Sequence, residues 1–71
     1  MPELAPHFPD VQVAVTSRNR WAVAAAVRQA MRRAGKDRNE IDLFVAEAVA
    51  AETPDRLSDV CRRWVRVQLP A

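Results

Sequence analysis

Two short runs in which apolar and polar residues alternate stand near the two ends of this chain, and they constrain its fold more than any other feature. The first run is Val11–Val15 and the second is Trp64–Leu69. Side chains alternate between the two faces of a β-strand, so each run predicts a strand with one apolar face. The two apolar faces comprise Val11, Val13 and Val15 in the first strand and Val65, Val67 and Leu69 in the second. We expect both faces to cover one common core.

The sequence between the two runs predicts a helical hairpin. Its first helix runs from about Arg20 to Ala34, with Asn19 or else Ser17 as the N-cap and Gly35 as the C-terminal stop. The second helix follows the capping pattern of Asp37 with Glu40, starts near Arg38 and ends near Ala51 or Glu52. The connection between them is short, so the two helices should be antiparallel. Their inward stripes are Val23, Val27, Ala30, Met31 and Ala34 in the first, and Ile41, Phe44, Val45 and Ala48 in the second.

A short third helix is predicted after Thr53, because Thr53 is a suitable N-cap and Pro54 suits the first helical position. The predicted fold is therefore one small α+β domain with the order β-α-α-α-β, in which the three helices cover a small sheet formed by the N- and C-terminal strands. This domain covers residues 11–69. Residues 1–10 contain three of the five prolines, which predicts a flexible arm.

The composition leaves self-association as the remaining common way of stabilising so small a chain, because disulfides and a structural metal are nearly excluded. A protein of 71 residues has a modest core. It contains one cysteine, Cys61, and one histidine, His7, too few for an internal disulfide or a structural zinc site. We therefore expect no metal and no cofactor, and we expect the chain to associate with itself as a homodimer.

Two further expectations follow from what the sequence lacks. No run approaches the ~18 consecutive apolar residues of a membrane span, and no secretory signal is recognisable, so a cytoplasmic protein is predicted. An enzyme is not expected, because His7 lies in the arm and Cys61 lies in an apolar stripe. Gly35 is the only glycine, which excludes a glycine-rich phosphate loop.

The candidate binding residues are tryptophans next to arginines. Trp21, Arg28 and Arg32 lie on the side of the first helix opposite its apolar stripe, and Trp64 and Arg66 share the outward face of the second strand. Such a surface suits a protein contact, in which Trp and Arg are enriched, or a nucleic acid, in which bases stack and phosphates need cations. Trp21 could also fold against the rest of the domain. Leu43, Ala46 and Ala50 form a lesser apolar seam on the second helix, to be covered by the third helix or by a second subunit.

The order of a strand, a helix, a glycine-containing turn and another helix is that of ribbon-helix-helix DNA-binding dimers, whose strands read the major groove. The side chains that would contact the bases in this chain are Gln12, Ala14 and Thr16. The match concerns the layout alone, since the third helix and the last strand have no place in that plan.

Three segments resemble a family of small uncharacterised proteins of bacteria and their phages. They are Asn19-Arg20-Trp21-Ala22-Val23, Glu47-Ala48 and Cys61-Arg62-Arg63-Trp64-Val65-Arg66-Val67. The chain departs from the family pattern at Arg18, where the family has glycine, and at the turn of residues 51–55. The resemblance implies the strand, helices and closing strand described above, and it leaves the function open.

The function expected from the sequence is that of a small non-enzymatic accessory or regulatory protein that binds a macromolecular partner as a homodimer. A nucleic-acid-binding protein that uses the same tryptophan and arginine residues is the alternative. A third alternative, suggested by the phage connection of the resemblance, is a sponge for signalling nucleotides.

Overall fold

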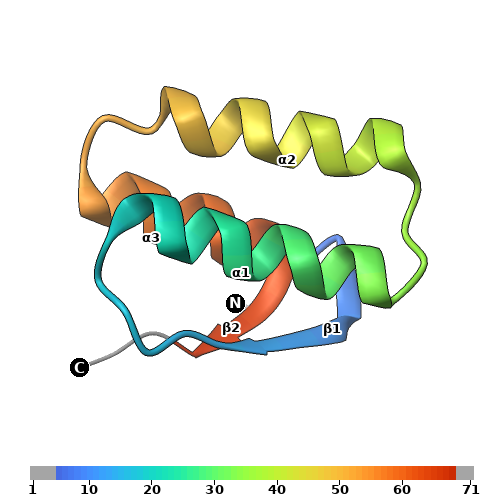
Figure 1. The fold of residues 1–71 in the computed structure, drawn as a ribbon. Helices are drawn as coiled ribbons and strands as arrows, with labels where there is room; N and C mark the ends of the chain where they lie inside the picture. Colours follow the sequence, from blue (N-terminus) through green and yellow to red (C-terminus); the bar gives the residue numbers. More distant parts are fainter. Residues whose placement is uncertain (1–4, 69–71) are drawn as a thin grey trace.

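The structure is a computed structural model that describes residues 5–68, and its elements follow the predicted order (Figure 1). They are β1 (Phe8–Ala14), α1 (Arg20–Arg33), α2 (Arg38–Ala50), α3 (Pro54–Trp64) and β2 (Val65–Gln68). The α+β architecture with the order β-α-α-α-β is confirmed. Residues 1–4 of the predicted arm and Leu69 of the predicted second strand lie outside the described residues.

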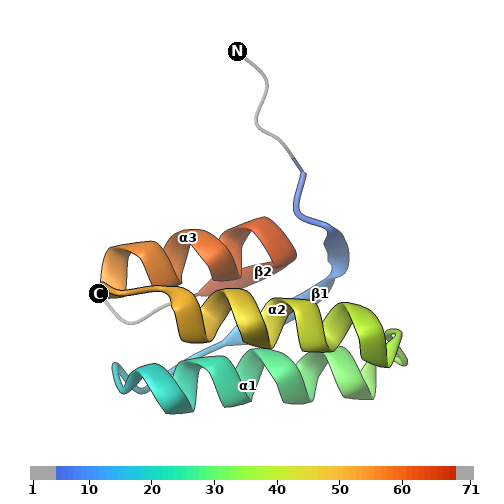
Figure 2. The same ribbon diagram turned by 90° about the horizontal axis from the view of Figure 1, so that it is seen from above.

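The elements form three layers. Figure 1 shows the two strands on one side, α1 and α3 packed against them, and α2 on the far side of those two helices. Figure 2, seen from above, shows α2 lying between α1 and α3. One face of the sheet is thus covered by α1 and α3, and the other face points outward.

The two strands are parallel, a direction that the sequence did not indicate. Gln12 lies opposite Arg66, and Val13 lies opposite Val67. The backbone N–H of Val15 also donates to the carbonyl of Gln68 at 2.8 Å, just beyond the end of β1. A parallel pair needs a long crossover, which the three helices supply.

The core lies between the sheet and the helices and collects the predicted apolar stripes except Ala34, which follows the end of α1 and is exposed. Val27, Met31, Phe44 and Cys61 are completely buried at its centre. The sheet contributes buried side chains at its inner face, namely Phe8, Val11, Val13 and Val65. Val67 is partly buried against the same cluster. The predicted common core of both strands is therefore confirmed.

The predicted helix caps are also present. The side chain of Asn19 accepts hydrogen bonds from the backbone N–H groups of Trp21 and Ala22, so Asn19, and not Ser17, is the N-cap of α1. Asp37 caps α2, and Thr53 caps α3. Gly35 follows α1 with a φ of 74°, a conformation that costs glycine little.

The prediction that the whole segment up to Asp10 is a flexible arm is wrong for its last residues. β1 begins at Phe8, and the ring of Phe8 is buried in the core. The amino group of Lys36 lies 4.9 Å from the centre of this ring and 2.8 Å from the Asp10 carboxylate. The prolines disfavour regular structure in this segment, but burial of the Phe8 ring outweighs this effect, because burying a Phe side chain contributes about 1.5–3 kcal/mol.

Candidate partner-binding surface

The three candidate residues of the first helix lie together in solvent. Trp21, Arg28 and Arg32 are all exposed on α1, and Trp21 retains 63% of its accessible surface. Helical spacing places Arg28 two turns after Trp21, and Arg32 one turn further. Among residues 5–68 the guanidinium groups of Arg28 and Arg32 have no hydrogen-bond or ion-pair partner, so both are available to an external group.

Arg20 fixes the surroundings of Trp21. Its guanidinium group lies 5.7 Å from the centre of the Trp21 ring. The same group donates hydrogen bonds to the backbone carbonyls of Val49 and Ala51. Because the last carbonyls of a helix lack intrahelical partners, Arg20 completes the C-terminus of α2. One side chain therefore joins the start of α1, where Trp21 lies, to the end of α2, where Val49 lies.

The neighbouring part of α2 is apolar and exposed. Val49 retains 54% of its accessible surface and Leu43 retains 59%, and Ala46 between them is exposed too. In the part of the chain that is described, the large exposed apolar side chains all belong to α1 and α2. We call Trp21, Arg28, Arg32, Leu43, Ala46 and Val49 the hairpin surface. The third helix does not cover the predicted seam on α2.

Trp64 does not belong to an exposed surface, and this prediction is wrong. Trp64 is the last residue of α3 and is 9% exposed. Its ring packs edge-on against Phe44, and its indole Nε1 donates a hydrogen bond to Oε2 of Glu47 at 3.3 Å. The physical reason is that α3 continues through Trp64, the residue at which the sequence predicts the second strand to begin. Helical spacing from Leu57 then turns Trp64 toward the core.

Arg66 is exposed, but it lies on a different side of the molecule from the hairpin surface. It stands on the outward face of β2, and its Nε donates a hydrogen bond to the carbonyl of Pro9 at 3.0 Å. The sheet and α2 are separated by the layer of α1 and α3 (Figure 1). The candidate residues therefore divide into the hairpin surface, the buried Trp64 and the separate Arg66.

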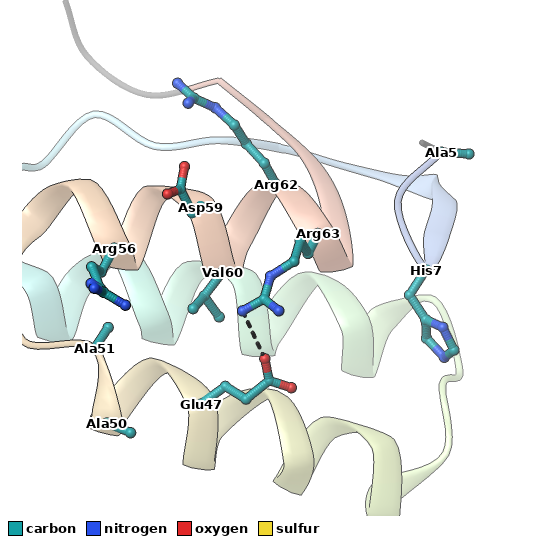
Figure 3. Close-up of a pocket in the computed structure, with 10 residues that line it drawn as sticks. All are labelled: Ala5, His7, Glu47, Ala50, Ala51, Arg56, Asp59, Val60, Arg62 and Arg63. Atoms are coloured by element: carbon teal, nitrogen blue, oxygen red, sulfur yellow. Dashed lines mark hydrogen bonds and ion pairs between the residues drawn. The ribbon is translucent and has the colours of Figure 1, made fainter. Parts of the chain in front are cut away.

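An open groove between α2 and α3 was not predicted from the sequence (Figure 3). Arg56 and Arg63 point from α3 toward α2, whose side of the groove carries Glu47 and Ala50. The Nη2 of Arg63 lies 3.2 Å from Oε1 of Glu47. The sequence signal for this groove was the seven-residue spacing of Arg56 and Arg63, which places both on one side of a helix. Because Glu47 neutralises Arg63 and bonds Trp64, we interpret this end of the groove as structural.

Cys61 and His7 both make contacts within the described part of the chain. Burial raises the pKa of the Cys61 thiol from 9.0 to about 11, so this sulfur is protonated at neutral pH. The Nε2 of His7 lies 3.3 Å from Oε1 of Glu40, and its ring stacks edge-on with Trp64. Within residues 5–68 no three His, Cys, Asp or Glu side chains gather in a group that could hold a metal ion.

Comparison with protein-family models, with characterised proteins and with solved structures finds no match to this chain. The resemblance to small bacterial and phage proteins therefore stays a prediction. The helices of the described part are all too short or too polar to cross a membrane.

Proposed function

We propose that this chain is a small non-enzymatic accessory or regulatory protein whose hairpin surface binds a protein partner, and that its first partner is a second copy of itself. The observation that carries this proposal is the exposure of Trp21 beside unpartnered arginines. Trp and Arg are the residues that most often dominate the binding energy of protein interfaces. The Arg20 guanidinium lies 5.7 Å from the centre of the Trp21 ring, and this contact favours one orientation of the ring before binding.

Two features of the hairpin surface support a second copy as the partner. In a symmetric dimer the same patch must be complementary to itself. The hairpin surface joins exposed apolar groups, Trp21 and Val49, to the cations of Arg28 and Arg32. The exposed carboxylate of Asp42 on α2 gives these cations a group of opposite sign on the other copy.

The contacts of the reactive groups support a binding role over catalysis. A nucleophilic cysteine needs a low pKa and access to solvent, and Cys61 has neither. His7 and Glu40 lie on the far side of α2 from Val49, where His7 packs against Trp64.

The fluorescence of Trp21 tests the proposal. Emission is recorded while the protein concentration rises from micromolar to millimolar, and burial of Trp21 in a dimer shifts its emission to shorter wavelength. Trp21→Phe is the matched control, because it leaves the buried Trp64 as the only fluorophore and its emission should not change with concentration. A wild-type spectrum that is the same at every concentration would contradict the proposal.

A further inference from the structure

The outward face of the sheet has a composition unlike that of the hairpin surface. Gln12 lies opposite Arg66 and Ala14 lies opposite Gln68, and all four are exposed. Both strands therefore present long hydrogen-bonding side chains on this face, with only one small apolar residue between them. Pairing in parallel is what brings these residues together, since the register sets β1 and β2 side by side at these positions.

The charge of this face has one sign. A shallow depression lies over it, and Arg62 at the end of α3 contributes to its wall together with Arg66, Gln12 and Gln68. Figure 3 shows Arg62 pointing away from α2, on the side of the strands. No carboxylate is among the described residues that line the depression. The carboxylate of Asp10 on β1 lies outside it and is already paired with Lys36.

The two arginines are free to bind an external group. Arg66 uses its Nε to contact the carbonyl of Pro9, which positions the side chain along β1. Within residues 5–68 the two terminal nitrogens of Arg66 have no hydrogen-bond partner, and the guanidinium of Arg62 has none either. Guanidinium groups bind phosphates and the O6 and N7 atoms of guanine, and the amide of Gln pairs with adenine.

The shape of the face also matches one kind of ligand. Neighbouring strands lie about 4.8 Å apart, so two strands with their side chains form a ribbon narrow enough for a groove about 12 Å wide. This is the width of the major groove of B-form DNA, whereas the major groove of duplex RNA is too narrow and deep to be read by side chains. The helices lie behind the other face of the sheet, so they do not obstruct such an approach (Figure 1).

We infer that the outward face of the sheet, formed by Gln12, Arg62, Arg66 and Gln68, binds duplex DNA by placing the β1–β2 ribbon in the major groove. This site lies on the other side of the molecule from α2 and is independent of the proposed dimer (Figure 1). Duplex DNA is then a second kind of partner, beside the second copy of the chain.

The experiment measures fluorescence anisotropy of a labelled DNA duplex of about 20 base pairs, of mixed sequence, titrated with the full chain at several salt concentrations. The test variant is the double substitution Arg62→Gln with Arg66→Gln. The matched control is Arg33→Gln with Arg38→Gln, which removes the same charge from exposed positions outside both the sheet face and the hairpin surface. Circular dichroism confirms that each variant folds, and Arg62→Gln alone serves if the loss of the Pro9 contact disturbs β1.

We expect the wild-type chain to bind with an affinity that falls linearly on a log–log plot against salt. The sheet variant should weaken binding about tenfold for each arginine near 0.1 M salt and lower the salt slope by about two. The control should bind nearly as well as the wild type. Absence of wild-type binding, an equal loss in both variants, or tighter binding of an RNA duplex or a single strand would each overturn the inference.

Discussion

The indole Nε1 of Trp64 donates a hydrogen bond to Oε2 of Glu47 at 3.3 Å and thereby ties the junction of α3 and β2 to the middle of α2. The ring itself packs between Phe8 of β1 and Phe44 of α2, with ring centres 5.9 and 6.1 Å away. Trp64 therefore contacts three parts of the fold, whereas Trp21 contacts solvent over most of its surface.

The two tryptophans should consequently differ in their effect on stability. Trp64→Ala removes a buried ring and should lower the free energy of unfolding by about 3–5 kcal/mol, enough to unfold a chain of this size. Trp64→Phe keeps most of the packing and should cost about 1 kcal/mol through the lost hydrogen bond. Trp21→Ala with Arg28→Ala should change stability by only about 0.5 kcal/mol.

Urea unfolding followed by circular dichroism measures these differences. If the Trp21 and Arg28 double variant is as unstable as Trp64→Ala, then Trp21 is a core residue and the hairpin surface is not a binding surface.

The pairing of Lys36 with Asp10 predicts a local dependence on pH. The hydrogen bond from Lys36 holds the pKa of the Asp10 carboxyl below its ordinary value of 3.8. Since the pKa is lower in the folded state, the contribution of this pair to stability is present above the unfolded pKa of 3.8 and is lost as the pH falls through the lower, folded pKa. Lys36→Met keeps an apolar stem near Phe8 and should raise the pKa of Asp10.

Carboxyl chemical shifts of Asp10, measured by NMR across an acid titration of both proteins, give the two pKa values. Equal pKa values in the wild type and in Lys36→Met would show that the pair does not form in solution.

The buried thiol of Cys61 predicts slow chemical modification. Because burial raises the pKa of the thiol to about 11, only a small fraction of Cys61 is thiolate at pH 8. The side chain is also completely buried, so a reagent reaches the sulfur only when the fold opens. The sign of the linkage follows from the raised folded pKa: its contribution to stability is full below the unfolded pKa of 9.0 and is lost as the pH rises from there through about 11.

A disulfide reagent monitored by absorbance tests this prediction, with the protein in urea as the fully accessible control. Rapid reaction in native buffer at pH 8 would mean that Cys61 is accessible. Cys61→Ser should fold less stably, because a hydroxyl at this apolar position lacks a partner.

The helices could be predicted from the sequence because their signals are local. Asn19, Asp37 and Thr53 each cap the helix that follows, and the structure places all three as expected. The apolar stripes and the alternation of the strands likewise predicted the shared core. The sequence left open whether Trp21 is exposed or folds against the rest of the domain. The way the helices pack leaves it exposed.

The features that the sequence did not show depend on contacts between distant segments. The parallel direction of the strands depends on how the three helices cross the sheet, and alternation is the same in either direction. Phe8 lies in a short stretch between Pro6 and Pro9, and only its burial against Trp64 places it in β1. Trp64 fits two patterns, since it continues the helical spacing from Leu57 and also begins the alternating run of the second strand. Its packing against distant residues determines that it belongs to α3.

Sedimentation equilibrium across a wide range of protein concentrations tests the central proposal, the association of two copies through the hairpin surface. The wild-type chain should approach twice its monomer mass of 8.0 kDa as its concentration rises. Val49→Asp should stay monomeric, and the matched variant Arg56→Ala on α3 should associate like the wild type. A wild-type mass of 8.0 kDa at every concentration, or a Val49→Asp variant that still doubles its mass, would contradict the proposal.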